Sequence, residues 1–245
     1  MRMSRHIAVI DVGKTNATLA LVDAATLNEI AVVTRPNRIL HGPPWPHFDL
    51  EGHWGFFIEG LRTVRTEHGV DAISITTHGA AAVLLDAAGG SAALMLNYEH
   101  DGPDALAAEY DTLWPRFEQT GAPRPGAGLN PGAQLHWMLR TDPGLEARLA
   151  HVVTYPQYWG YRLTGVLASD VTSLGCHSDL WQPFAARASD LVAKLGMSGR
   201  LAPPRPASDV LGVVTPDIAA LTGLAPDTPV ACGIHDPTLR SIRMC

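Results

Sequence analysis

Two short acidic motifs lie near opposite ends of this 245-residue sequence, and their residue types suit phosphoryl transfer. The first is IDVGKTN at residues 10–16, and the second is GIHD at residues 233–236. Phosphoryl transfer depends mostly on positioning and charge, so it needs a carboxylate beside the nucleophile and neutralising groups beside the phosphates. Each motif supplies one carboxylate, Asp11 and Asp236, and the first also supplies a glycine, a lysine and two polar side chains.

The first motif has the composition of a phosphate-binding turn between two strands. Gly13 lets a backbone approach a phosphate closely, Lys14 adds positive charge, and Thr15 and Asn16 add polar groups. A Walker loop is excluded because the glycine spacing differs and a strand, not a helix, follows. An ordinary β-hairpin with Asp11 as a turn residue is the alternative, and these residues alone leave both interpretations open.

Apolar runs, and the glycine, proline and polar turn residues between them, predict the strands and helices that must position these motifs. Three consecutive strands are expected within residues 7–35, then a helix over 52–67 and a buried strand over 70–77. Residues 203–206 contain three prolines and predict a rigid linker. A meander followed by alternating helices and strands predicts an α/β domain with a mixed sheet. Further strands are predicted at 81–86, 92–96, 152–154, 210–214 and 229–233, and further helices at 104–113, from 134, at 156–164, 185–195 and 216–222.

Composition and charge exclude several classes of function. A net charge of −6 and a pI near 6.0 indicate no basic surface for nucleic acid. The sequence contains neither an 18-residue apolar span for a membrane nor the features of a secretory signal, so we expect a cytoplasmic protein. The three cysteines and eleven histidines lack disulfide or metal-ligand spacing. We therefore expect reduced thiols and no structural metal site.

Four segments, in this order, resemble the FGGY carbohydrate kinases, members of the actin, hexokinase and heat-shock-70 superfamily. They are the motif at 10–16, THG and VLLD within 77–86, YRLTG and SDVT within 161–172, and GIHD at 233–236. The resemblance implies an α/β, ribonuclease-H-like (actin-like ATPase) domain whose mixed sheet opens with a three-strand meander. It also implies that residues 1–236 are the N-terminal lobe of such a kinase.

The resemblance implies a reaction and roles for the two motifs. ATP would phosphorylate a sugar hydroxyl in the presence of Mg²⁺. Asp236 matches the position of the family's catalytic base, where it would accept the hydroxyl proton or orient the hydroxyl. Asp11 would hold Mg²⁺, directly or through water, and the turn at residues 13–16 would hold the ATP phosphates.

Four other side chains are candidates for contacts with the sugar. His78 follows a predicted strand, although a core histidine bonded to the backbone is the alternative. Glu99 falls where the family often has a Trp/Tyr-x-Asp-x-Arg segment, from which NYEHD departs, so the specificity stays open. Gln157 precedes the LTG motif and can donate and accept, while Asp170 is either a sugar contact or the cap of a turn. We expect a ketose such as rhamnulose, fuculose or xylulose rather than glycerol.

Two neighbouring pairs invite a catalytic interpretation. His235 beside Asp236 suggests a dyad, but adjacent strand residues point to opposite faces, so we expect one of them to face away. Cys176 beside His177 suggests a nucleophile, but no third group is placed to activate it, and we assign it no role.

The sequence after Asp236 no longer resembles the family. We interpret residues 237–245 as a short tail, and the family's C-terminal lobe, which supplies most of the adenosine site, is absent. A truncation, a reading-frame change or a domain fragment would explain this, and we expect weak sugar binding and negligible turnover from the chain alone. A non-catalytic sugar-binding or regulatory module of the same superfamily is the alternative function, and a homodimer is left open.

Overall fold

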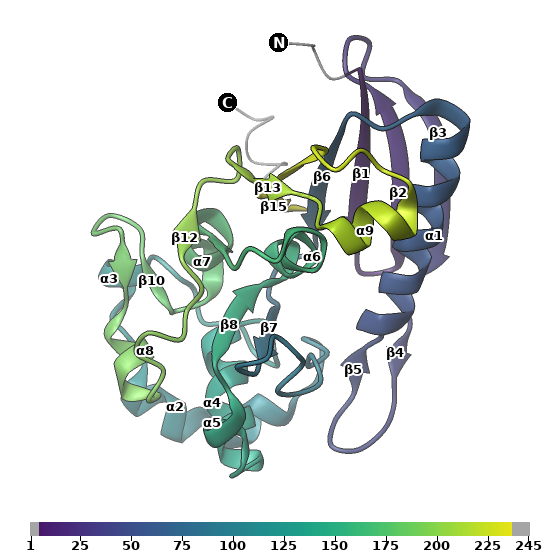
Figure 1. Ribbon diagram of the computed structural model, residues 1–245. Helices are drawn as coiled ribbons and strands as arrows, with labels where there is room; N and C mark the ends of the chain where they lie inside the picture. The colour runs from purple at the N-terminus through teal and green to yellow at the C-terminus, as the bar shows by residue number, and fades with distance from the viewer. Residues whose placement is uncertain (1–4, 237–245) are drawn as a thin grey trace.

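The computed structural model describes residues 5–236, in which seven strands form a mixed sheet (Figure 1). The strand order is β13-β14-β6-β1-β2-β3, and β15 also pairs with β6. Antiparallel β1, β2 and β3 form the predicted meander, whereas β1, β14 and β15 run parallel to β6. The predicted tail at 237–245 lies outside the described residues. The bounds are β1 His6–Val12, β2 Asn16–Asp23, β3 Glu29–Pro36, β6 Ala72–Thr77, β13 Val210–Val213, β14 Pro229–Ala231 and β15 Ile234–His235.

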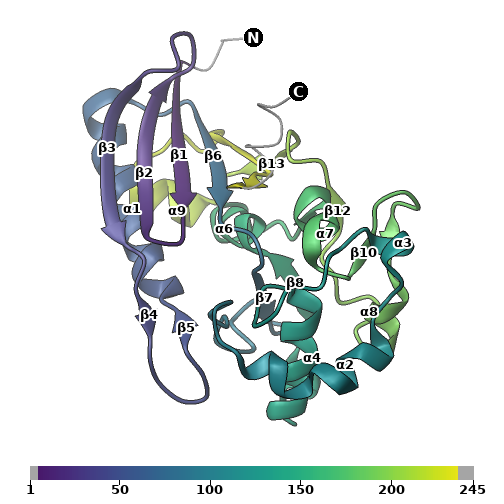
Figure 2. The ribbon, with the colours of Figure 1, turned by 180° about the vertical axis from the view of Figure 1, so that it is seen from behind.

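Alternating burial along β1 determines which face of the sheet is covered. Ala8, Ile10 and Val12 are fully buried, and the residues between them are half-buried. The buried set packs in one core with Phe57 and Leu61 of helix α1 (Leu50–His68). Helix α9 (Pro216–Thr222) lies beside α1, and Figure 2 shows both helices behind the strands. The period-2 pattern in the sequence thus places the apolar side chains of β1 against these helices.

A second apolar core includes Leu84, Leu135 and Leu191, whereas helix α6 (Tyr155–Thr164) packs with Trp159 and Leu163 in the first core. Within residues 5–236 no helix combines the length and apolar character needed to cross a bilayer. The bounds are β4 Ile39–Leu40, β5 His47–Phe48, β7 Ala82–Leu85, η1 Gly102–Leu106, α2 Ala107–Leu113, α3 Phe117–Thr120, α4 Pro131–Thr141, α5 Leu145–Arg148, β8 His151–Thr154, α6 Tyr155–Thr164, β9 Ser169–Asp170, α7 Val171–His177, β10 Trp181–Gln182, β11 Arg187–Ala188, α8 Asp190–Lys194 and β12 Pro204–Arg205.

Three of the predicted elements are wrong. Residues 92–96 form no strand, because their backbone bonds to two different neighbours: Ala92 N donates to the Leu84 carbonyl, and the Met95 carbonyl accepts from Phe48 N. The helix predicted at 185–195 is a β10–β11 hairpin followed by the short helix α8, since Ala186 has a positive φ of 49° that breaks a helix. Residues 203–206 are not a free linker, because β12 pairs in parallel with β9.

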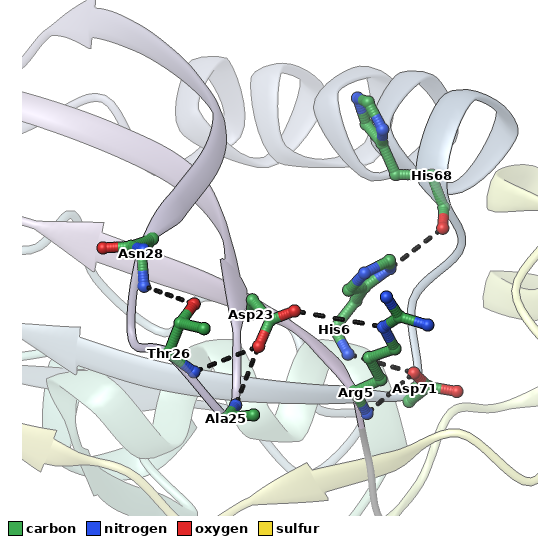
Figure 3. A network of polar contacts seen from close by, with 8 residues as sticks. All are labelled: Arg5, His6, Asp23, Ala25, Thr26, Asn28, His68 and Asp71. Carbon is green, nitrogen blue, oxygen red and sulfur yellow. Dashed lines mark hydrogen bonds and ion pairs between the residues drawn. The ribbon is translucent and has the colours of Figure 1, made fainter.

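A polar network closes the sheet at the amino end of β1 (Figure 3). Asp71 Oδ2 accepts hydrogen bonds from the backbone N–H groups of Arg5 and His6, each at 3.0 Å. Asp23 Oδ1 accepts from the N–H groups of the turn that joins β2 to β3, at 2.8 and 3.1 Å. The His6 ring donates through Nδ1 to the carbonyl of His68 at the end of α1, at 2.9 Å. The network ties β1, the β2–β3 turn and the end of α1 together.

Candidate functional site

Three parallel strands end at one edge of the main sheet, opposite the network of Figure 3. The register places both Val12 of β1 and His235 of β15 beside Thr77 of β6. Parallel strands bring their carboxyl ends to the same edge. Asp11 is the next-to-last residue of β1, and Asp236 directly follows β15. The fold therefore brings together the two acidic motifs from opposite ends of the sequence.

The carboxylates of Asp11 and Asp236 lie close enough to interact electrostatically. Burial raises the pKa of Asp11 above its usual range, and the negative charge of Asp236 raises that pKa further. Two like charges in a partly desolvated site disfavour ionisation in this way.

Thr76 adds an unsatisfied hydroxyl beside Asp11. It lies opposite Asp11 in the register between β1 and β6, and its Oγ1 is buried without a hydrogen-bond partner within residues 5–236. Buried polar groups normally have partners, so an orphaned one beside a carboxylate marks an incomplete polar site. Thr76 was not among the predicted site residues, because a threonine inside a predicted strand carries no signal of its own.

The predicted phosphate turn is a tight turn between β1 and β2. Gly13 N donates to the Asn16 carbonyl at 2.9 Å, and Asn37 holds the turn from the side. The Asn37 N–H donates to the Thr15 carbonyl and its Nδ2 to the Gly13 carbonyl, both at 2.8 Å. A Cβ on residue 13 would have one described atom within 4 Å, the Asn16 carbonyl oxygen at 3.4 Å. The described chain thus leaves space beside the Gly13 backbone.

A buried side-chain network connects this turn to the start of α1. His53 is fully buried, with Nε2 at 2.9 Å from Asn37 Oδ1 and Nδ1 at 3.3 Å from Arg35 Nη1. Burial lowers the pKa of His53 to about 4, helped by the positive charge of Arg35, so the neutral ring donates to Asn37 and accepts from Arg35. Arg35 also pairs with Asp49, whose Oδ1 caps α1 by accepting from Gly52 N at 2.9 Å. These residues are distant in sequence, so no local motif predicted the network.

Lys14 and Glu99 form an ion pair beside the turn at residues 13–16. The Lys14 side chain is 60% exposed and that of Glu99 is 50% exposed, so the pair itself adds little stability. Lys14 was predicted to contact phosphate and Glu99 to contact sugar. The structure brings the two side chains together, with Glu99 beside the predicted phosphate turn.

His78 is a buried, neutral histidine with one unused ring nitrogen. Its Nδ1 donates to the Gly79 carbonyl at 3.0 Å, and its Nε2 has no partner within residues 5–236. Burial lowers its pKa to about 4. The rings of Phe48, Tyr98 and Tyr155 surround it at centroid distances of 4.9 to 5.0 Å. His78 therefore bonds to backbone, as the alternative interpretation held, and also offers Nε2 as a free acceptor.

A narrow cavity adjoins this edge of the sheet. Its lining includes His78, Gly79, Ser173, His177 and His235, and its volume is about 20 Å³. That volume accommodates one water-sized group, so a hydroxyl fits inside and a sugar ring does not.

Gln157 and Asp170, both predicted to contact sugar, are fully buried and bonded to protein atoms. Gln157 Nε2 donates to the carbonyls of Cys232 at 2.8 Å and Gly233 at 3.0 Å. Asp170 caps α7, accepting from Thr172 N at 3.2 Å and Ser173 N at 2.9 Å, which agrees with the capping interpretation. Their sugar contacts stay predictions.

His235 and Asp236 face opposite ways, as strand alternation predicted. His235 is buried beside Thr77, whereas Asp236 is partly exposed. His235 Nδ1 lies 3.3 Å from the hydroxyl of Ser173, which donates to Asp170 Oδ2 at 2.9 Å. Burial lowers the pKa of His235, and the charge of Asp170 partly opposes that effect. Ser173 was missed, since its role depends on a contact between α7 and β15.

The meander sheet and the paired carboxylates define the class as an actin-like kinase lobe. A model of the N-terminal domain of the FGGY family of carbohydrate kinases matches residues 117–242, about half of the sequence. The chain belongs to this family, which confirms the resemblance and the predicted fold.

Relatives in sequence and structure agree with this assignment. The chain is 28% identical over 194 residues to a rhamnulokinase of Klebsiella pneumoniae, matching 72% of this chain and 39% of the relative. It superposes with a TM-score of 0.88 and 35% identity on a carbohydrate kinase from Novosphingobium aromaticivorans, covering 96% of this chain and 50% of that one. A xylulose kinase from Rhodospirillum rubrum gives 0.82 and 26%, with 97% and 51% covered. The chain thus spans about half the length of the solved kinases it matches.

Proposed function

We propose that this chain is the lobe that binds sugar and supplies the base in an ATP-dependent kinase acting on a ketose hydroxyl. The observation that carries the proposal is the meeting of Asp11 and Asp236 at the carboxyl ends of parallel strands. Phosphoryl transfer requires a carboxylate beside the nucleophile and a metal ion beside the phosphates, and the second carboxylate would hold that ion.

Asp236 is the proposed catalytic base. It is partly exposed at the edge of the sheet, where an incoming hydroxyl can reach it. Its carboxylate accepts the hydroxyl proton, or orients the hydroxyl, as the oxygen attacks the γ-phosphorus of ATP. The neighbouring His235 is buried on the opposite face, so the proton transfer is assigned to Asp236 alone.

Asp11 is the proposed ligand of Mg²⁺, and the donor set fits that ion. Mg²⁺ prefers oxygen and is usually held by one or two carboxylates together with water and substrate phosphates. Asp11 and the unsatisfied Thr76 hydroxyl provide oxygen atoms, and no group of three or more His, Cys, Asp or Glu within residues 5–236 competes as a metal site. The bound ion would neutralise charge on the phosphates of ATP. Thr15, Asn16 and the open backbone of Gly13 would contact those phosphates.

Lys14 would bind phosphate only after it leaves its partner. Its ammonium pairs with Glu99 at the surface. Because exposed ion pairs contribute little, a phosphate can replace the carboxylate at low cost. Glu99 is then released to accept a hydrogen bond from the sugar.

His78 is the proposed sugar contact best supported by its surroundings. Its Nε2 accepts a hydrogen bond, and a hydroxyl group is the donor that a neutral imidazole nitrogen would take. The aromatic rings of Phe48 and Tyr98 flank the imidazole. A ketose is favoured because relatives include a rhamnulokinase and a probable L-xylulose kinase.

A ligand panel tests the proposal with the 245-residue chain. Ketoses, polyols and aldoses are compared by thermal shift, each added in 10-fold to 1,000-fold molar excess over the chain at about 10 µM. A ligand that binds the native state raises its apparent stability. We expect a ketose to raise the unfolding temperature, and His78→Phe to abolish the rise. Sugar-dependent ADP release, measured with ATP and Mg²⁺ on a chain that also carries a C-terminal lobe, then separates a kinase from a binding module. A chain that responds to no ketose would contradict the proposed substrate class.

A further inference from the structure

The strand that leads to Asp236 contains one extra residue. β14 and β15 both pair in parallel with β6, with Val230 beside Ile73 and Ile234 beside Thr76. From Val230 to Ile234 the chain advances by four residues, whereas from Ile73 to Thr76 strand β6 advances by three. A single-residue excess of this kind is a β-bulge, and it falls at Cys232 and Gly233.

The bulge changes the face on which Asp236 emerges. Successive strand residues alternate between faces, so one extra residue reverses the alternation for everything that follows. Val230 and Ile73 are buried on the covered face. Without the bulge Asp236, six residues later, would point to that same covered face.

With the bulge, Asp236 shares a face with Asp11. His235 now occupies the covered face beside Thr77, and the partly exposed residues are Ile234 and Asp236. Asp11 is likewise partly exposed between two buried neighbours of β1. The bulge is thus what turns the carboxylate of residue 236 toward that of residue 11.

Hydrogen bonds hold the bulge on both sides. The N–H groups of Cys232 and Gly233 donate to the carbonyls of Asp209 at 2.8 Å and Ala207 at 3.3 Å. Their own carbonyls both accept from Nε2 of Gln157, at 2.8 and 3.0 Å. Gly233 adopts a φ of +87°, and a Cβ there would lie 2.7 Å from the Ile75 carbonyl oxygen.

Gln157 is itself fixed in orientation by a buried threonine. The Thr154 hydroxyl donates to Gln157 Oε1 and accepts from Asp170 N at 3.1 Å. That contact makes Oε1 the acceptor and directs the amide hydrogens at the bulge. Gln157 is fully buried, so its amide is committed to the bulge and cannot reach a ligand without breaking these bonds.

We propose that Gln157 is a positioning residue: by binding the two carbonyls of the bulge it holds Asp236 on the face of Asp11. This role is an alternative to the predicted sugar contact of Gln157. The positioning role rests on the proposed function only for the chemical role of Asp236. The placement of the backbone can be tested without measuring turnover.

Hydrogen exchange tests the placement in the 245-residue chain. Gln157→Met keeps the length of the side chain and removes both donors. We expect amide exchange in residues 230–236 to rise at least tenfold while exchange in residues 6–23 stays within twofold of the wild type. The control is Gln182→Met, because Gln182 is also buried, lies in the β10–β11 hairpin and has an Nε2 without a partner among the described residues. Thr154→Val is a milder second variant, with an expected rise of about threefold.

The variant Gln157→Glu should make the protection of residues 230–236 depend on pH, which general destabilisation would not do. In Gln157→Glu a carboxylate faces two carbonyl oxygens at pH 8, whereas the protonated acid can donate to one of them. Protection of residues 230–236 should therefore increase at least threefold from pH 8 to pH 6, relative to Gln182→Glu. Unchanged exchange in folded Gln157→Met, or a flat profile in Gln157→Glu, would overturn the positioning role.

A kinetic comparison distinguishes positioning from sugar contact. In a form of the protein with sugar-dependent ADP release, Gln157→Met should lower kcat at least tenfold and leave KM within threefold. A raised KM with kcat retained would mean that Gln157 touches sugar, against our proposal. If no form of the wild-type protein, including one that carries a C-terminal lobe, shows turnover, that result would count against the proposed function alone, because the exchange experiment still decides the position of the bulge.

Discussion

The two ends of strand β1 hold aspartates in opposite physical states. At the amino end, Asp71 and Asp23 each accept two backbone hydrogen bonds, and those bonds lower the pKa of Asp23 (Figure 3). At the carboxyl end, burial and the charge of Asp236 raise the pKa of Asp11. The amino end is thus satisfied within the chain, whereas the carboxyl end carries repulsion and orphaned polar atoms. Natural sequences accept such local conflicts mainly where a ligand is bound.

The largest expected effect separates the two ends by function. Asp236→Asn, in a form of the protein that releases ADP with its sugar, should lower kcat about a thousandfold, since the amide cannot accept the hydroxyl proton. The coupled ADP-release assay measures this, with circular dichroism as the check on folding. Asp23→Asn at the amino end is the control and should retain turnover. Equal turnover of Asp236→Asn and wild type would remove Asp236 from the mechanism.

The bulge at the carboxyl end should be sensitive to a single methyl group. Gly233→Ala should lower the free energy of unfolding by about 3 kcal/mol, because it combines a positive φ with a clash against the Ile75 carbonyl. Gly121→Ala is the matched control: φ is +65° and no described atom lies within 4 Å, so the loss should be about 1 kcal/mol. Urea denaturation measures both. Equal losses would mean that the bulge tolerates the methyl group.

The network behind the phosphate turn should make stability depend on pH. The pKa of His53 is about 4 in the folded chain and 6.5 when exposed, so its contribution is present above pH 6.5 and is lost as the pH falls toward 4. Between pH 7 and pH 5 this amounts to roughly 2 kcal/mol. His53→Gln should remove that part of the slope in urea denaturation. A variant with the wild-type slope would show that His53 is not buried as a neutral ring.

The smallest effects should have opposite signs at the two ends. Asp71→Ala leaves two backbone N–H groups without their partner and should lower the free energy of unfolding by about 1 kcal/mol. Asp11→Asn should raise it at pH 7, because the raised pKa means that the charged form is disfavoured in the folded state. Denaturation of both variants at pH 7 measures the signs. Destabilisation by Asp11→Asn would contradict the contrast between the ends.

The sequence predicted correctly those strands and helices whose hydrophobic periodicity is visible within a few neighbouring residues. The alternation in β1 and the apolar period of α1 placed the meander and its covering helix correctly, because strand and helix periods are written directly in the sequence. The prediction of a helix at 185–195 was wrong because residues 181–188 form a hairpin whose turn places Ala186 at a positive φ, which its composition does not indicate. Asn37, His53, Thr76 and Ser173 were missed for a related reason, since each acts through a partner on another element.

The sequence by itself determined the family, the two carboxylates and the strands that carry them, because these depend on residue type and short-range spacing. Only the tertiary structure decided that the carboxylates share a face. That outcome depends on one extra residue between β14 and β15, counted against β6, and on Gln157 binding the bulge from α6. Register is a relation between strands far apart in the chain, so no stretch of sequence read alone contains it.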